Sequence, residues 1–270
     1  LVGNSALRLG AIGWDERKAT ASEQATMRSM LVESMEQGAY GISSGLDYPP
    51  GSYASTEELA NLAHASAQLG GFYHSQSVEA FFTHVPGLKV VRPSTPMDAK
   101  GLLKSAIRDD NPVIFIESET LYAIKGEVPE DPDFLVPLGQ AAIRREGTDV
   151  TVVAYMGMLY RALEVAEELA REGISMEIVD PRTLRPMDTE SILNSVRKTH
   201  RCVVIEAGAG FAGMGSEIAA EIQEEAFDDL DAPVCRVTGE NAPMPYARNL
   251  ELLKTPSKAK IADAIRKVCA

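Results

Sequence analysis

The second half of the chain alternates strand-like and helix-like segments, and this regularity restricts its fold more than any other feature. Short apolar segments typical of buried strands are "DVTVVAY", "SMEIVD", "CVVIEAG" and "VCRVT". Between and after them lie segments with helical periodicity: "LYRALEVAEELAREG", "DTESILNSVRKT", "GSEIAAEIQEEAF" and "SKAKIADAIRKVC". Strands joined through helices run parallel, so the pattern predicts an α/β fold whose parallel sheet is covered by helices on both faces.

A shorter α/β segment precedes this region. "LKVVRPS" and "PVIFIES" have the composition of strands, and the helix between them starts with Thr95, Pro96 and Asp98, which suit an N-cap, a first helical position and a first turn. Residues 119–136 then contain two prolines and five acids and follow neither the helical nor the strand period. We therefore predict a linker at 119–136 and a domain boundary there.

Two helices are expected near the start of the chain. Thr20 and Glu23 form a capping-box pattern before a helix from about Ser22 to Gln37, and Ser55 and Glu58 repeat that pattern before "ELANLAHASAQLGG". Between them, "AYGISSGL" is short and apolar enough for a buried strand. The order of helix, strand, loop and helix suits part of a barrel or of a layered α/β unit.

Composition limits the partners and the compartment. The 270 residues carry a net charge of −13, which argues against nucleic acid and favours small molecules and proteins as partners. Three cysteines without CxxC spacing predict neither a zinc cluster nor a disulfide framework, as in a reducing, cytoplasm-like compartment. No long apolar run predicts a membrane span, and no signal peptide is visible. The chain starts without Met, so residue 1 is a possible truncation point.

A glycine motif allows two interpretations. Gly208, Gly210 and Gly213 have the G-x-G-x-x-G spacing of dinucleotide sites, after a strand and before a helix. However, the next strand does not end in the acid that would bind a ribose. We favour a tight strand-to-helix turn, although the amides at the start of the helix could hold an anionic side chain of a partner protein.

From His74 onward, three long segments carry a specific resemblance: "HSQSVEAFFTHVPGLKVVRPSTPMDAKGLLKSAIRDDNPVIFIE", "PRTLRPMDTESILNSVRKT" and "FDDLDAPVCRVTGENAPMPYA". They resemble the beta subunits of thiamine-diphosphate-dependent pyruvate dehydrogenases, members of the transketolase-like family. This resemblance implies the tail of a pyrimidine-binding domain at 74–118, the linker at 119–136, and a transketolase C-terminal-like domain with a parallel sheet at 137–270. We expect the last domain to fold independently.

Residues 1–73 resemble a different family, the N-acyl-D-amino-acid deacylases of the amidohydrolase superfamily. "LVGNSALRLGAIG" and "MRSMLVESMEQGAYGISSGLDYPPGSYASTEELANLAHASAQLGGFY" carry this resemblance, which implies a fragment of a metal-dependent barrel. Most metal ligands of that family lie outside this window, Asn4 stands where the family often has His, and a lone helical histidine such as His64 is more often a core or surface residue than a ligand. We interpret the chain as a chimera whose seam lies in "GGFYHSQ".

The dehydrogenase resemblance also implies site residues. His74 matches a histidine that faces the active site, where imidazole can exchange protons near neutrality; alternatively it merely caps a helix. A potassium ion would be held by the carbonyls of Ala106 and Ile107 and by Asp109 and Asn111, or else these residues simply cap a helix end. The glutamate that activates thiamine diphosphate belongs to the missing half of the pyrimidine-binding domain, and the alpha subunit holds the diphosphate. The chain should therefore be unable to complete the cofactor site alone.

The implied function is oxidative decarboxylation of pyruvate with acetyl transfer to lipoyl groups. Its implied partners are a dehydrogenase alpha subunit, a second beta subunit and a dihydrolipoyl acyltransferase core, in the cytoplasm or, in a eukaryote, in the mitochondrial matrix. Two alternatives remain at this point. The chain could be a non-catalytic module for subunit assembly, or it could be a fragment of a metal-dependent deacylase.

Overall fold

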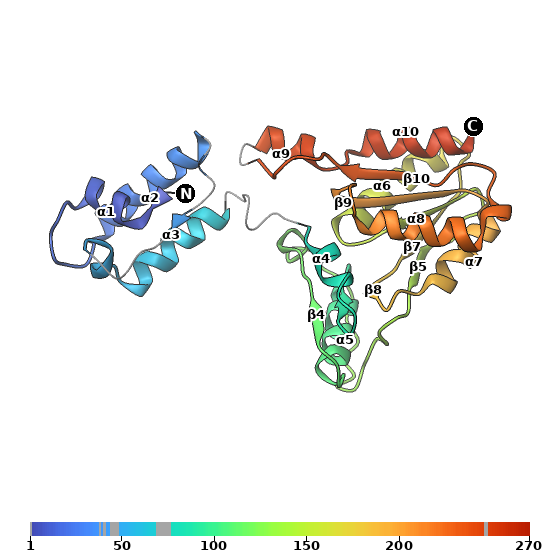
Figure 1. Cartoon of the computed structure of the whole chain (residues 1–270), viewed down its shortest axis with the longest axis horizontal. Helices are drawn as coiled ribbons and strands as arrows, with labels where there is room; N and C mark the ends of the chain where they lie inside the picture. The colour runs from blue at the N-terminus through green and yellow to red at the C-terminus, as the bar shows by residue number, and fades with distance from the viewer. Residues whose placement is uncertain (1, 38, 40–41, 44–48, 69–76, 246–247) are drawn as a thin grey trace. The chain divides into compact units, whose positions relative to one another are not determined.

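The computed structural model divides the chain into two compact units (Figure 1). It describes residues 2–37, 39, 42–43, 49–68, 77–245 and 248–270. One unit comprises Leu1–Gln76 and Ala242–Lys254, and the other comprises Ser77–Asn241 and Thr255–Ala270. Within the described residues, no helix is both long and apolar enough to cross a membrane.

The first unit is mainly helical around a small sheet. Its elements are β1 (Val2–Gly3), α1 (Asn4–Ala11), α2 (Ala21–Glu36), β2 (Ile42–Ser43), the short 3-10 helix η1 (Gly51–Tyr53), α3 (Thr56–Gln68) and α9 (Arg248–Lys254). The predicted capping box is present, because the Thr20 amide donates to Glu23 Oε2 at 2.8 Å and the Glu23 amide donates to Thr20 Oγ1 at 3.3 Å. A core buried between the helices contains Leu7, Met27, Leu31, Met35, Leu62 and Ala65.

The predicted amidohydrolase-barrel fragment is not supported by this unit. β1 and β2 pair in parallel over two residues each, and the described residues extend this pair by no further strand. A barrel needs continuous pairing around a closed sheet. The unit instead buries an ion pair of Arg8 with Glu58 at 2.5 Å, which joins α1 to α3.

The second unit contains the predicted parallel sheet. Its strand order is β10 (Cys235–Gly239), β9 (Cys202–Ala209), β6 (Val150–Ala154), β7 (Met176–Asp180) and β5 (Ala142–Arg145). The first four strands are mutually parallel, as in the register of Val152 opposite Val203. β5 was not predicted and closes one edge as an antiparallel strand.

Helices cover both faces of this sheet, as the sequence predicts (Figure 1). α6 (Gly157–Ala170) and α10 (Lys258–Cys269) pack on one face, and α7 (Thr189–Thr199) and α8 (Met214–Glu225) pack on the other. A short 3-10 helix, η3 (Phe227–Asp229), follows α8. The two apolar cores are each built from every second residue of the strands, because successive side chains alternate between the faces.

A second, three-stranded sheet lies within the same unit. Its order is β4 (Val113–Phe115), β3 (Lys89–Val91) and β8 (Thr183–Arg185), with α4 (Glu79–Thr83), α5 (Pro96–Ile107) and the 3-10 helix η2 (Glu119–Leu121) beside it. β8 comes from the predicted C-terminal domain and pairs antiparallel with β3. The two sequence regions are therefore interlocked by backbone hydrogen bonds.

Buried charges join the same two regions. Asp98 on α5 is fully buried and binds Arg144 of β5 and, at 3.2 Å, Arg182 after β7. Arg144 also contacts Asp180, the last residue of β7, at 2.8 Å. Two carboxylates thus share two guanidinium groups, which satisfies the condition that buried charges be paired.

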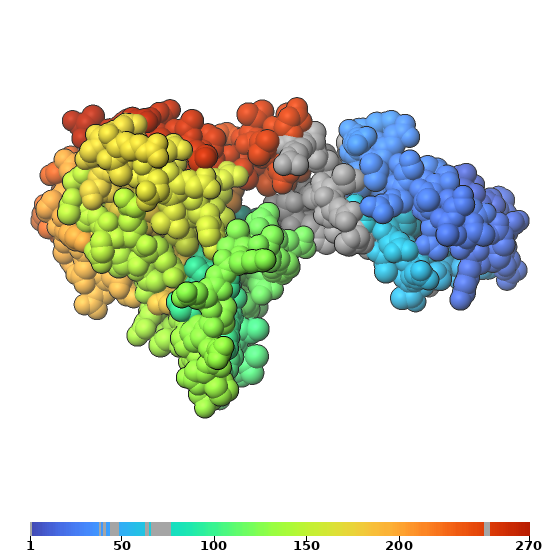
Figure 2. All heavy atoms as spheres, turned by 180° about the vertical axis from the view of Figure 1, so that it is seen from behind, coloured from blue at the N-terminus to red at the C-terminus, as the bar shows by residue number. Residues whose placement is uncertain are grey.

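The predicted linker, residues 119–136, contains η2. The C-terminal end of the linker packs against α5. Ser105 Oγ donates to the carbonyl oxygen of Val136 at 2.6 Å, and a methyl group added to Gly101 would lie 2.5 Å from Val136. Phe134 packs in the same small core. This segment forms part of the green surface of the unit in Figure 2. The proposed domain boundaries at 118 and 136 stay predictions.

Candidate functional site

His74, the candidate catalytic residue, lies outside the described residues, which resume at Ser77. The side chain of His64 also lies outside the described part, although its backbone belongs to α3. Asn4, the residue in place of a deacylase-type histidine, is the first residue of α1 and is buried.

The predicted cation-binding residues lie close together at the end of α5. Ala106 and Ile107 are its last residues, and Asp109 and Asn111 occupy the turn before β4. The Asp109 amide donates to the Ala106 carbonyl at 3.4 Å, and Asp109 Oδ1 accepts from the Asn111 amide and side chain, both at 2.9 Å. The Lys89 ammonium binds Asp109 Oδ2 and, as the main cause, lowers the pKa of Asp109 to about 2.

These contacts limit how a cation could bind there. The Asp109 carboxylate is already neutralised by Lys89, so a cation would depend mainly on helix-end carbonyls and the Asn111 side-chain oxygen. Across the described residues, no group of three or more His, Cys, Asp or Glu side chains is arranged to hold a metal ion. The donor set fits a weakly held monovalent cation better than a divalent metal.

The glycine-rich turn is filled by groups of the chain itself. A methyl group at Gly208 would lie 3.1 Å from Cβ of Ser77, and one at Gly210 would lie 2.7 Å from Oγ1 of Thr238. Methyl groups at Gly213 and Gly215 would lie 2.7 and 2.8 Å from the carboxylate of Glu206. Each glycine is thus needed because another part of the protein approaches closely.

Glu206 occupies the place that a phosphate takes in a dinucleotide site. It is the fifth residue of β9, is 1% exposed, and accepts hydrogen bonds from the Gly215 and Met214 amides at the start of α8. These amides favour an anion at the start of α8, and the carboxylate of Glu206 lies there. The structure thereby favours the tight-turn interpretation over dinucleotide binding, and the anion held at α8 is internal rather than from a partner.

Burial and a neighbouring acid disfavour the charged form of Glu206. Burial raises its pKa from 4.5 to about 7, the Gly215 amide opposes this rise, and the charge of Glu79 adds to it. Its Oε1 atom accepts no hydrogen bond from the described residues. Glu206 is therefore a buried acid that exchanges a proton near neutrality.

Glu79 on α4 belongs to a buried polar cluster beside Glu206. Its carboxylate pairs with Arg92, which follows β3, and accepts a hydrogen bond from the Tyr155 hydroxyl at 3.2 Å. The Arg92 guanidinium carbon lies 5.3 Å from the centre of the Tyr155 ring. Arg92 Nε also lies 2.7 Å from the sulfur of Met156. Burial, as the main cause, and the neighbouring acids raise the pKa of Tyr155 well above its usual value.

Sequence reasoning did not find this cluster. One signal was available: Glu206 ends an apolar run, "CVVIE", directly before the glycines. An acid at the end of a buried strand and next to a helix start is a candidate for capping that helix from outside. Glu79 and Arg92 gave no comparable signal, because their pairing depends on tertiary structure.

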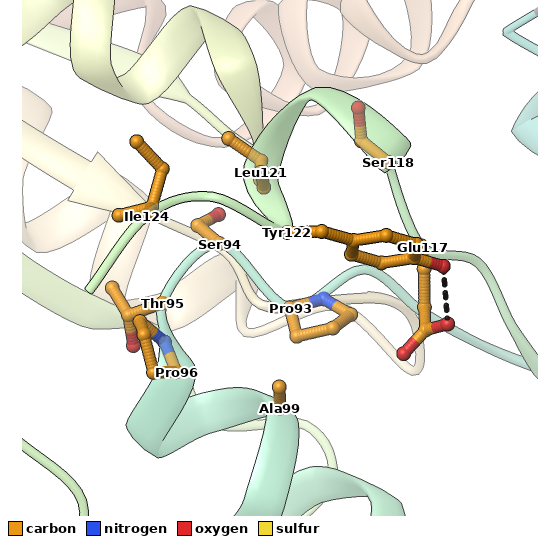
Figure 3. A pocket seen from close by; sticks show the side chains of 10 residues that line it. All are labelled: Pro93, Ser94, Thr95, Pro96, Ala99, Glu117, Ser118, Leu121, Tyr122 and Ile124. Carbon is orange, nitrogen blue, oxygen red and sulfur yellow. Dashed lines mark hydrogen bonds between the residues drawn. The ribbon is translucent and has the colours of Figure 1, made fainter. Parts of the chain in front are cut away.

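A pocket of about 180 Å³ opens at the carboxyl ends of β3 and β4 (Figure 3). Its apolar wall includes Leu121 and Ile124, and Tyr122 donates a hydrogen bond to Glu117 at 3.0 Å. That bond and the charge of Glu117 raise the pKa of Tyr122. Ligands of open α/β sheets often bind at this end of the strands, but the one charged lining residue, Glu117, is exposed.

Two family models match the chain. Residues 60–125 match the pyrimidine binding domain of transketolase, and residues 139–261 match the transketolase C-terminal domain. The first match starts inside the segment that resembles deacylases, and neither the match nor the structure supports a deacylase relationship or a chimera. Over the matched residues, the chain belongs to the transketolase-like family.

Similarity to individual proteins narrows this assignment. The chain is 51% identical over 197 residues to the pyruvate dehydrogenase E1 component subunit beta of Rhizobium meliloti (strain 1021), covering 73% of this chain and 43% of the relative. Against the mitochondrial E1 beta subunit of Dictyostelium discoideum, identity is 48% over 201 residues, covering 73% and 56%. A solved structure titled "Split gene transketolase, inactive beta4 tetramer" matches with a TM-score of 0.60 and 28% identity, covering 73% of this chain and 63% of that one. The chain spans about half the length of these curated relatives.

The described residues do not fit thiamine diphosphate by themselves. The cofactor needs a carboxylate against its aminopyrimidine ring, and the buried carboxylates of the second unit all have partners inside the chain. Glu79 binds Arg92, Asp98 and Asp180 bind Arg144, Glu177 binds Lys198, and Glu206 binds the amides of α8. A complete cofactor site would require residues from elsewhere.

Proposed function

We propose that the chain is a beta-subunit-like component of a thiamine-diphosphate-dependent pyruvate dehydrogenase. The observation that carries this proposal is the 51% identity over 197 residues to a pyruvate dehydrogenase E1 beta subunit. The α/β architecture of the second unit supports it, since β3 and β4 lie within the range of the pyrimidine-binding model and all five strands of the larger sheet lie within the range of the C-terminal model. The proposed reaction of the assembled enzyme is oxidative decarboxylation of pyruvate with acetyl transfer to lipoyl groups.

The chain is proposed to be inactive alone. Its buried carboxylates are committed to internal partners, and it spans about half the length of its relatives. An alpha subunit, a second beta subunit and a dihydrolipoyl acyltransferase core are the proposed partners. His74 is the proposed catalytic residue from this chain, and Ala106, Ile107, Asp109 and Asn111 are proposed to hold a potassium ion.

Location follows from the relatives. Relatives from Dictyostelium discoideum and Caenorhabditis elegans are named as mitochondrial. We propose the mitochondrial matrix if the chain comes from a eukaryote, and the cytoplasm if it comes from a bacterium.

Reconstitution tests the catalytic proposal. The chain is mixed with thiamine diphosphate, the alpha subunit that accompanies a similar beta subunit, and the first half of that beta subunit's pyrimidine-binding domain, which supplies the activating glutamate. Pyruvate-dependent reduction of an artificial electron acceptor is measured, and we expect turnover with all components present and none when the alpha subunit or the added half domain is left out. The intact similar beta subunit is the positive control, and a His74→Ala chain is the matched negative control. Absence of turnover in a complex that demonstrably forms would contradict the catalytic proposal.

A second candidate is a non-catalytic assembly module. Phe81 and Phe211 favour it, because these large apolar side chains are 77% and 87% exposed, as expected of side chains that a partner covers. Complex formation without turnover would support this function. A stable complex whose turnover depends on His74 would refute it.

A further inference from the structure

The start of α4 lies against the glycine-rich turn of the C-terminal sheet. α4 begins five residues after His74 in the sequence. We propose that Gly208, Glu206 and Arg92 form a cradle that positions Ser77 and α4, and that a proton on Glu206 tightens this contact. The docking itself is independent of the proposed function, and its importance for His74 rests on that function.

Three contacts define the cradle. Ser77 packs on Gly208, where even a methyl group would lie 3.1 Å from its Cβ atom. Thr83 Oγ1 lies 3.2 Å from the sulfur of Met214 at the start of α8. Both ends of the segment 77–83 therefore touch residues that flank the turn.

The third contact is the buried ion pair of Glu79 with Arg92. Both side chains are less than 10% exposed, and Arg92 is fixed in turn by Tyr155 and Met156. A buried pair of this kind holds its partners strongly in place, since separating it leaves an uncompensated buried charge. A five-residue helix such as α4 has little stability of its own, so these tertiary contacts must fix its position.

The charges around Glu206 make this docking sensitive to a proton. Facing it are Glu79 from α4, Tyr155 directly after β6, and Arg236 from β10, while Arg92 after β3 pairs with Glu79 and lies over the Tyr155 ring. Arg236 is exposed and is engaged with the Gly210 carbonyl at 2.9 Å and with Ser216. Inside the cradle, Arg92 pairs with Glu79, so the negative charge of Glu206 adds to that of Glu79 with only the exposed Arg236 to oppose it.

The charges around Glu206 determine whether a rise in pH opens or closes α4. When Glu206 is neutral, Glu79 and Arg92 balance each other and α4 docks closely. When Glu206 loses its proton, its charge repels Glu79 across a buried, poorly screened environment. Opening α4 relieves that repulsion, so α4 should open more often as the pH rises through neutrality.

Hydrogen exchange of the full chain tests whether the contact of Ser77 with Gly208 positions α4. Gly208→Ala should push Ser77 away and raise the exchange of amides 77–85 by about tenfold, as expected for an overpacked contact. Gly157→Ala is the matched control, because a methyl group there has nothing within 4 Å. The proposal fails if Gly208→Ala and Gly157→Ala give the same exchange in this segment.

Hydrogen exchange at pH 6 and pH 8 tests whether protonation of Glu206 controls the opening of α4. After correction for the intrinsic pH dependence of exchange, the α4 amides of the unmodified chain should open about tenfold more often at pH 8, the factor for one pKa unit of coupling. Glu206→Gln should abolish this difference, whereas Glu217→Gln, on an exposed position of α8, should keep it. An equal pH difference in the Glu206→Gln chain would overturn the role of Glu206. Neither result depends on turnover, so the cradle and the proposed function can fail separately.

Discussion

Replacing Asp98 by Asn should destabilise the second unit strongly, because it leaves a buried charge without its partner. Asp98 is fully buried and contacts both Arg144 and Arg182, whose side chains are 14% and 12% exposed. The amide keeps the shape but removes the negative charge, so Arg144 would keep only Asp180 and the Arg182 guanidinium would keep only the carbonyls of Gln140 and Ala141 as hydrogen-bond acceptors. Breaking a buried pair in this way costs about 3 kcal/mol.

Urea unfolding followed by circular dichroism measures this loss. With a slope of about 2 kcal/mol/M, the midpoint should fall by about 1.5 M. Asp110→Asn is the control, since Asp110 is exposed near the end of the same helix and should shift stability by less than about 0.5 kcal/mol. The pairing also predicts that adding Arg144→Met to Asp98→Asn costs less than the sum of the two changes. Equal shifts for the two Asn variants, or strict additivity, would refute the reasoning.

Three further predictions follow from the site. Gly210→Ala should destabilise the chain by about 1 to 3 kcal/mol in urea unfolding, because the new methyl group would lie 2.7 Å from Thr238, whereas Gly157→Ala should not. Replacing choline chloride in the buffer by potassium chloride should raise the melting temperature by a few degrees through a cation at the end of α5, and Asn111→Ala should lessen this rise; an equal rise in both chains would contradict the site. The folded pKa of Glu206 is about 7 and its ordinary value is 4.5, so the folded state binds an extra proton between these values. Stability should therefore fall by about 3 kcal/mol as the pH rises from about 4.5 to 7, and Glu206→Gln should remove that fall in urea titrations.

Local patterns in the sequence predicted the local structure well. The alternation after residue 149 correctly gave the parallel strands and the helices on both faces, because apolar periodicity directly records which side of an element is buried. The capping box at Thr20 was equally readable, since its two side-chain bonds span only three residues.

Features that depend on distant partners were missed. β8 is three residues long and carries no recognisable period, and it exists as a strand because β3 lies beside it. The burial of Val136 against α5, at the end of the predicted linker 119–136, was likewise not foreseen. A short strand or a packed irregular segment is defined by tertiary contacts that composition does not record.

The glycine-rich turn illustrates a different limit. Spacing alone showed that something approaches the backbone at Gly208, Gly210 and Gly213, but not which group. A bound phosphate and a buried carboxylate would both require glycines in this turn, because each lies close to the backbone. Only the structure showed Glu206 at the start of α8, which favours a tight turn over a dinucleotide site.

Association with an alpha subunit tests the account most directly, because both the catalytic and the assembly function require it. Native mass spectrometry of the chain mixed with the alpha subunit of a similar pyruvate dehydrogenase would detect the complex, with the intact beta subunit as positive control. We expect a complex that contains both chains. If the intact beta subunit assembles while this chain stays free at the same concentrations, its assignment as a beta-subunit-like component is contradicted.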